Sequence, residues 1–111
     1  MTTLLPQDQN DYPIPALRMK RNGAHRITAN NSSSRNNTAF DEKTRVVGIY
    51  ADVPIYIAFG NASVNATTND HFFPAGIYYD VAIGGDNSAH YTHIAVLQAD
   101  SAGTLFISEK E

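Results

Sequence analysis

The chain has 111 residues, 42% of them hydrophobic and 17% charged, and its formal net charge is −3. This length suits one domain with an appended segment, and the composition allows a hydrophobic core, although so small a domain is only marginally stable. The chain contains no cysteine, which excludes disulfides and thiolate metal sites. Small domains without such cross-links often gain stability by packing against copies of themselves or a larger partner.

The first fifteen residues lack the positive segment and the apolar core of a secretory signal peptide. No run in the chain approaches the about 18 apolar residues that a membrane span needs. We therefore expect a protein that is made in a cytoplasm and has no membrane partner.

Residues 1–37 predict an extended arm. Three prolines among the first fifteen residues oppose a continuous helix, and residues 30–37, NNSSSRNN, are polar with nothing to bury. A short strand could form over residues 24–29, but we expect the segment as a whole to become ordered only on a partner. The remainder, residues 38–111, should then fold without it.

Charge and apolar anchors together mark this arm as a binding segment. Five of the eight Lys and Arg residues lie between positions 18 and 35, where there is no Asp or Glu, and the rest of the chain carries three basic and eleven acidic residues. Such an asymmetry can attract an acidic partner or a second copy. The predicted partner-binding residues are Tyr12, Ile14, Leu17, Arg18, Met19, Lys20, Arg21 and Arg26.

The second region, residues 38–111, predicts a β-domain. Short runs rich in Val, Ile, Tyr and Phe alternate with turn residues at intervals of about 8–12 residues, which is typical of a sandwich or barrel. The runs are TRVVGIYA, PIYIAFG, HFFPAG, IYYDVAIGG, THIAVLQA and GTLFISE. We expect an all-β protein with a single antiparallel β-sandwich, either jelly-roll-like or immunoglobulin-like.

Turn residues suggest how the runs connect. Residues 52–54, Asp-Val-Pro, predict a turn that joins runs 45–51 and 55–59 into an antiparallel hairpin. Residues 100–103 likewise predict that the last run pairs with the run before it. The segment 60–70, GNASVNATTND, predicts an exposed polar loop that buries nothing.

The apolar phase of each run predicts the core, because successive side chains of a strand point to opposite faces. The expected core residues are Val47, Ile49, Ile55, Ile57, Phe59, Ile77, Tyr79, Val81, Ile94, Val96, Leu105 and Ile107.

Catalytic and metal-binding patterns are absent from the sequence. There is no G-x-S-x-G motif, no cysteine and no pair of carboxylates placed for acid–base work. His90 and His93 are three residues apart, which would direct them to opposite faces of a strand. We therefore expect no enzyme activity, no cofactor and no metal.

Two binding alternatives remain open. The six tyrosines could line a sugar-binding face, although tryptophan, the commonest platform for sugar stacking, is missing. The basic arm could reach nucleic acid, but five charges without a fold signature do not favour that partner.

The order of motifs from about residue 45 to 109 resembles that of small virion structural proteins of tailed bacteriophages. The shared elements are a V-x-I-x-A strand, an x-P/C-x-Y-I-x-F-G strand, a Thr/Ser/Asn-rich loop, an F-x-P-A-G turn, an I-A-V-L-Q-A strand and a closing G-T-L-x-I-x-E strand. The matching residues are Val47, Ile49, Ala51, Ile55, Tyr56, Ile57, Phe59, Gly60, Phe73, Pro74, Ala75, Gly76, Ile94, Ala95, Val96, Leu97, Gln98, Ala99, Gly103, Thr104, Leu105, Ile107 and Glu109.

This resemblance implies a non-enzymatic virion protein, made in the host cytoplasm, that decorates or cements a capsid in many copies. Its implied partners are the major capsid protein or other virion proteins, and copies of itself in a homo-oligomer. The alternatives are a neck, collar or tail-associated structural protein, and a carbohydrate-binding β-sandwich module.

Overall fold

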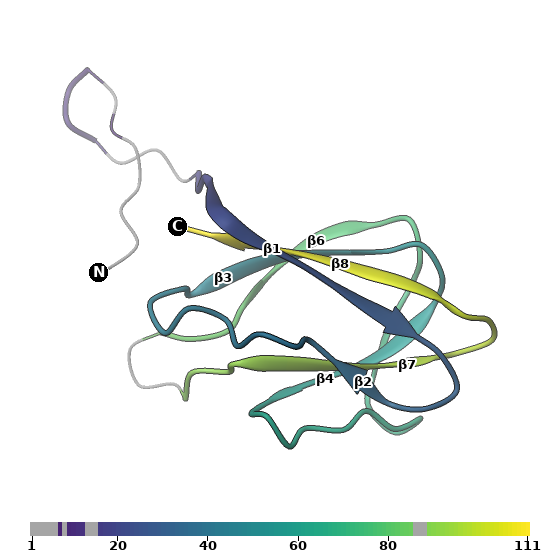
Figure 1. Cartoon of the computed structure of the whole chain (residues 1–111). Coiled ribbons are helices and arrows are strands. Elements are labelled where there is room, and N and C mark those ends of the chain that lie inside the picture. Colours follow the sequence, from purple (N-terminus) through teal and green to yellow (C-terminus); the bar gives the residue numbers. More distant parts are fainter. Residues whose placement is uncertain (1–6, 8, 13–15, 86–88) are drawn as a thin grey trace.

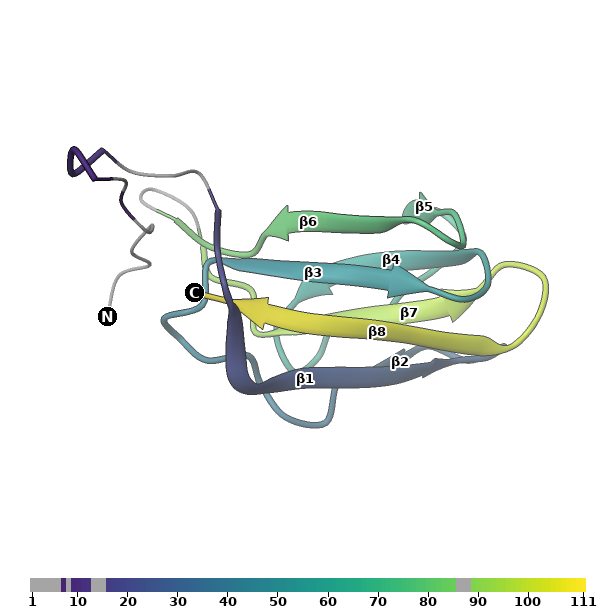
Figure 2. The same ribbon diagram turned by 90° about the horizontal axis from the view of Figure 1, so that it is seen from above.

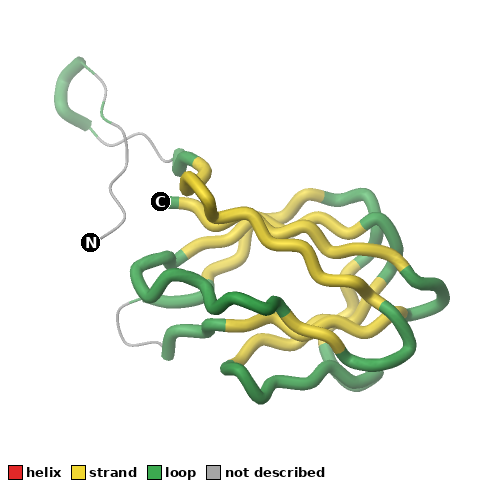
Figure 3. Tube along the Cα trace, in the orientation of Figure 1, coloured by secondary structure: helices red, strands yellow, loops and turns green. Residues whose placement is uncertain are grey.

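Strands and loops make up the whole described part of the chain, which is residues 7, 9–12, 16–85 and 89–111 of the computed structural model (Figures 1 and 3). The strands are β1 (Met19–Ala29), β2 (Ser34–Arg35), β3 (Val46–Ala51), β4 (Ile55–Gly60), β5 (His71–Phe73), β6 (Tyr78–Ala82), β7 (His93–Gln98) and β8 (Gly103–Lys110). These residues contain no helix that could cross a membrane. The predicted all-β sandwich is confirmed.

Two four-stranded antiparallel sheets form the sandwich, with strand orders β1-β8-β3-β6 and β2-β7-β4-β5 (Figure 2). The pairs β1–β8, β2–β7, β3–β6 and β4–β5 are the successive rungs of one long antiparallel ribbon. Rolling up that ribbon adds the pairs β3–β8 and β4–β7, which complete the sheets. This is the topology of an eight-stranded jelly roll, the first of the two expected sandwich types.

The inner faces of the two sheets supply the core, as the alternation predicted. Eight of the expected residues are buried: Val47, Ile49, Ile55, Ile57, Ile94, Val96, Leu105 and Ile107. Phe59 and Val81 are half-buried and pack against this cluster. The core also takes in residues outside the expected set: Ile27, Ala29, Phe40, Ala51, Phe73 and Ile83.

Ile77 and Tyr79, also expected in the core, are 48% and 57% exposed, so this part of the prediction is wrong. Tyr79 lies opposite Ile49 on β3 and therefore points to the same side of the sheet. However, β6 is the edge strand of its sheet, and β5, the edge strand of the other sheet, has only three residues. The sandwich is open at this edge, so the β6 side chains that point inward are exposed to solvent.

Both predicted hairpins are also wrong, because each pair of runs is divided between the two sheets. The links after β3 and after β7 carry the chain from one sheet to the other. These two corners bind each other: the Asp52 carboxylate accepts a hydrogen bond of 2.7 Å from the Thr104 amide. Any Cβ at Gly103 would collide with the Val53 side chain and the Asp52 carboxylate. The corner therefore holds Asp52 and Val53 against β8, while the chain continues into the other sheet.

The predicted boundary at residue 37 differs from the structure, because the sandwich begins at Met19. Strand β1 pairs along β8 and supplies Ile27 and Ala29 to the core, and β2 pairs with β7. Removing residues 1–37 would take away both strands, so the remainder is not expected to fold alone. The polar loop 61–70 also differs from expectation, since Ala66 within it is 5% exposed.

We predict that truncating Leu105 to Ala lowers the free energy of unfolding by about 2–5 kcal/mol, because the side chain is fully buried and leaves a cavity. Asn69→Ala, in an exposed part of the 61–70 loop, should change it by less than about 0.5 kcal/mol. Urea unfolding of both variants checks this, and equal destabilisation would contradict the assignment of inside and outside.

Candidate functional site

The outer faces of the two sheets differ in what covers them. Over the β2-β7-β4-β5 sheet, the loop after β4 lays Val64 and Ala66 against Ala58, Ala95 and Leu97. No described segment packs in this way over the outer face of the β1-β8-β3-β6 sheet. Among the described residues, that sheet therefore presents its outward side chains directly to the surroundings.

A row of large side chains crosses this uncovered face. Arg26 on β1 lies opposite Phe106 on β8, Phe106 lies opposite Tyr50 on β3, and Tyr50 lies opposite Tyr78 on β6. Phe106 and Tyr50 are each 37% exposed and Tyr78 is 48% exposed. We call these four residues the aromatic row. Since residues directly opposite on a sheet share a face, the row is fixed by strand register.

Neighbouring contacts hold the rings of the row in place. The Tyr50 and Phe106 ring centroids are 6.4 Å apart, and the Arg26 guanidinium carbon lies 5.4 Å from the Phe106 centroid. The ring of Tyr78 lies over Gly48, where any Cβ would collide with the Tyr78 hydroxyl. A ring can lie flat on the sheet there only because position 48 is glycine.

The Lys110 side chain holds the Tyr78 ring in place. Its ammonium lies 4.9 Å from the Tyr78 ring centroid and 2.8 Å from the Asp80 carboxylate. The hydrogen bond to Asp80 raises the pKa of Lys110 and outweighs the opposing effect of burial, with a further contribution from Tyr78. Lys110 is therefore charged at neutral pH and keeps the cation–π contact.

The predicted partner-binding residues do not form one continuous site. Arg26 belongs to the aromatic row, while Met19 and Arg21 are exposed on β1 away from it. Arg18 forms a 3.0 Å ion pair with Glu111. The ammonium of Lys20 lies 3.9 Å from Asp41.

The remaining members of that set lie before β1. Tyr12 is 67% exposed and Leu17 is half-buried. Ile14 lies outside the described residues. Of the members of the predicted set that the structure describes, only Arg26 is joined to the aromatic row.

The aromatic row was missed by sequence reasoning because its members lie on strands far apart in the chain. The available signal was the outward phase of the runs: Tyr50, Tyr78 and Phe106 each stand one residue away from an inward-facing position. Only the register between β8, β3 and β6 shows that they are neighbours.

The four histidines have different surroundings. His25 binds Glu109, the Nε2 atom of His90 lies 2.9 Å from the Thr44 carbonyl oxygen, and Nδ1 of His93 lies 2.8 Å from the Thr92 hydroxyl. His71 is exposed on β5. No group of three or more His, Asp or Glu side chains lies close enough to hold a metal within the part of the chain that the structure describes.

One carboxylate is buried at the end of the sandwich. Glu109 is 4% exposed and points between the sheets, opposite Val47. Its Oε1 accepts hydrogen bonds from the Thr44 hydroxyl (2.6 Å) and the Asp41 amide (2.9 Å), and its Oε2 lies 2.8 Å from His25 Nε2. The contacts join β8 to β1 and to the segment before β3.

These contacts set the ionisation of Glu109. Burial alone would raise its pKa, but the hydrogen bonds with His25, Thr44 and the Asp41 amide outweigh burial and lower it below 4.5. The carboxylate is thus ionised at neutral pH, and its role is to hold segments together.

Comparison with known protein families, with curated proteins and with solved structures found no match. The function must therefore be argued from the aromatic row and the surrounding surface.

We predict that Glu109→Gln removes stability at neutral pH and flattens its dependence on pH. A carboxylate whose pKa is lowered by folding stabilises the native state above its unfolded pKa, and that contribution is lost as the pH falls through the folded pKa. The loss at pH 7 should be about 1–3 kcal/mol, since buried donors lose their charged acceptor.

Urea unfolding between about pH 7 and pH 3 measures this effect, and the wild type and the variant should converge as the pH falls through the lowered pKa of Glu109. Glu111→Gln is the matched control, because the Glu111 ion pair with Arg18 is largely exposed. A constant difference between wild type and Glu109→Gln at every pH would contradict the assignment.

Proposed function

We propose that the chain is a non-enzymatic virion structural protein that decorates or cements a bacteriophage capsid through the aromatic row. The observation that carries this proposal is the rigid, uncovered row of Arg26, Phe106, Tyr50 and Tyr78 on one outer face of the sandwich. Aromatic residues and arginine are enriched at protein–protein interfaces and dominate their binding energy. The jelly roll is compatible with this role, but capsid proteins, lectins and cupins share it, so the fold alone does not choose among them.

Preorganisation suits the row for docking. Side chains that are already held by Gly48, Lys110 and neighbouring rings lose little conformational entropy when a partner covers them. The gain in binding therefore comes mainly from burying the exposed parts of the three rings.

The row is small, which favours attachment as many copies joined to one another. Its three rings stand on three adjacent strands, which places them within about 10 Å across the sheet. This is small beside the about 800 Å² that each partner buries in a stable interface, so other parts of the face must contribute. Weak contacts of this kind become strong when linked copies, such as those of a homo-oligomer, bind one particle, because each further binding event is then intramolecular. The partner in this proposal is the major capsid protein or another virion protein.

We predict that the double variant Tyr50→Ala/Phe106→Ala binds assembled phage heads at least about tenfold more weakly than the wild type, because two central rings are lost. Cosedimentation with heads that lack the protein measures this. Phe72→Ala is the matched control, since Phe72 is 57% exposed on the other sheet and should bind normally. Equal binding by all three proteins would overturn the proposal, and circular dichroism checks that the variants are folded.

Electron microscopy of native particles tests the location. Density for the chain in repeated copies on the head supports decoration, whereas density at the neck or tail would replace it with the alternative structural role. A protein absent from purified particles would contradict both.

We also predict that attachment weakens as salt rises, because Arg26 carries the only formal charge in the aromatic row. Arg26→Gln should bind more weakly at low salt and respond less to added salt. Arg18→Gln is the control, because Glu111 already pairs with Arg18 within the chain. Salt titrations of head binding measure both, and an unchanged salt response in Arg26→Gln would show that the apolar contacts dominate.

A further inference from the structure

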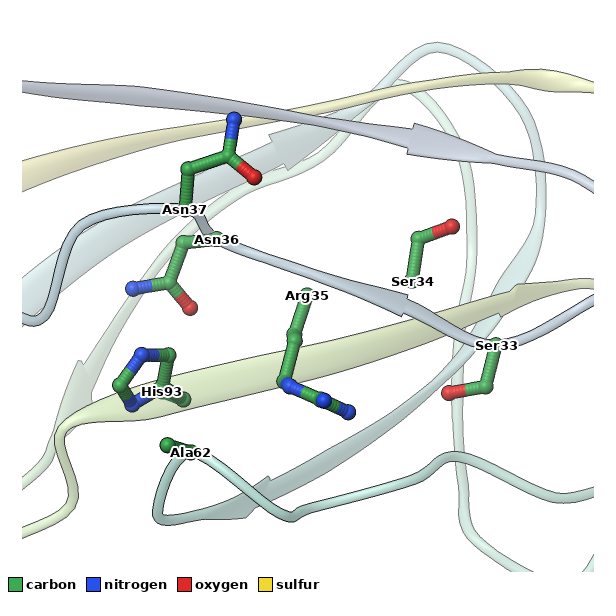
Figure 4. Close-up of a pocket in the computed structure, with 7 residues that line it drawn as sticks. All are labelled: Ser33, Ser34, Arg35, Asn36, Asn37, Ala62 and His93. Carbon is green, nitrogen blue, oxygen red and sulfur yellow. The ribbon is translucent and has the colours of Figure 1, made fainter.

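A polar pocket lies on the other sheet, beside β2. It has a volume of about 510 Å³ and lies between residues 33–37 of β2 and its flanks, Ala62 of the loop after β4, and His93 of β7. In Figure 4 the Arg35 guanidinium and the Ser33 hydroxyl point to the side where His93 and Ala62 lie, whereas Ser34 and Asn37 point away. The volume falls within the about 300–1,000 Å³ of small-molecule sites.

Arg35 is positioned in this pocket by the loop after β4. Its Nη1 donates hydrogen bonds to the Val64 carbonyl (2.9 Å) and to Oδ1 of Asn65 (3.3 Å). These bonds leave the Nε and Nη2 donors of the guanidinium for another partner. A planar guanidinium with two donors on one side matches a carboxylate.

The pocket holds a single formal positive charge. No Asp or Glu lines it, and burial first and then the charge of Arg35 lower the pKa of His93 below 6.5. His93 is therefore neutral at neutral pH. Since Nδ1 lies against the Thr92 hydroxyl, its Nε2 is the ring nitrogen left for a ligand.

Other polar groups at the pocket differ in what they can still bind. The Asn36 amide is fully used by the carbonyls of Thr38 and Thr92 and by the Ile94 amide. The Ser33 hydroxyl accepts from the Ala66 amide, and its own proton remains to be donated. The pocket therefore offers three binding groups: the Arg35 guanidinium, the Ser33 hydroxyl on one side of it and the neutral His93 imidazole on the other (Figure 4).

We propose that this pocket binds a sugar acid, with Arg35 holding its carboxylate and with His93, on one side of Arg35, bonding a ring hydroxyl (Figure 4). The polar lining suits a hydroxylated ligand, and the charge of Arg35 selects an anionic one. A bare phosphate or acetate ion would leave most of the volume to water. The pocket and the aromatic row lie on different sheets, so this proposal does not depend on the proposed function.

Titration of the full ¹⁵N-labelled chain with glucuronate, followed by NMR, tests the proposal. We expect saturable shifts at Arg35, His93 and the loop after β4, with a dissociation constant of about millimolar. Glucose lacks the carboxylate and acetate lacks the hydroxylated ring, so each should bind at least about tenfold more weakly. The absence of saturable shifts with glucuronate, or equal binding of glucose, acetate or inorganic phosphate, would overturn the proposal.

Variants separate ligand binding from loop support. Arg35→Gln should weaken glucuronate binding at least about tenfold, and Arg35→Lys, which keeps the charge without the fork, should fall between it and the wild type. Asn65→Ala removes one of the two hydrogen bonds that position the same guanidinium and keeps the Val64 bond and the charge, so it should weaken glucuronate binding much less than Arg35→Gln does. A loss in Asn65→Ala equal to that in Arg35→Gln, or no loss in Arg35→Gln, would assign Arg35 to loop support and overturn the proposal.

A last control separates the two surfaces. Tyr50→Ala/Phe106→Ala should bind glucuronate like the wild type, and Arg35→Gln should still attach to heads. Loss of glucuronate binding in the double variant would contradict the placement of the sugar-acid site in this pocket.

Discussion

The ionised carboxylate of Glu109 holds together the end of the sandwich where the chain enters and leaves. A carboxylate inside a protein is costly unless it is fully hydrogen-bonded, and here His25, Thr44 and the Asp41 amide surround it. Strand β1 can approach Glu109 closely because position 23 is glycine, where an added Cβ would come within 2.9 Å of the Glu109 Cβ. One side chain thus fixes β1, the segment that leads into β3, and β8. Arg26, Tyr50 and Phe106 lie on β1, β3 and β8.

This fixed frame explains why the aromatic row can exist at all. Its four residues come from β1, β8, β3 and β6, and they are neighbours only while those strands keep their register. A shift of one residue would turn the rings inward and the core residues outward. At the opposite end, Asp52 and Gly103 bind the two corners where the chain changes sheets. Contacts at both ends therefore hold in register the strands that display the row.

Local pattern was enough to predict the strands and most of the core, but not their arrangement. The alternation of apolar residues identifies the inward-facing positions in 47–49, 55–57 and 105–107, because it can be recognised from residues that are neighbours in the sequence. A short link such as 52–54 can close a hairpin or cross between sheets, and here it packs against the distant Gly103, a contact that local pattern does not contain. Where β1 lies, the sequence predicts an arm with a short strand over residues 24–29 at most. Only Ile27 and Ala29 of the β1 side chains are buried, and a bulge near Asn22, with a φ of 63°, interrupts the alternation. The site depends on register, which local pattern does not contain.

The separation of the two proposed sites on different sheets has a physical consequence. A chain attached to a particle through the aromatic row would leave the β2-β7-β4-β5 sheet, and with it the pocket at Arg35, facing away from the attachment surface. Each pocket offers one charged fork and few further donors, so its affinity for a single sugar acid is weak. Many copies on one particle would place many such pockets within reach of one polymeric ligand, and rebinding among them would raise the overall affinity without any new contact. A rigid jelly roll suits this arrangement, because the frame that fixes the row also fixes the direction in which the pocket opens.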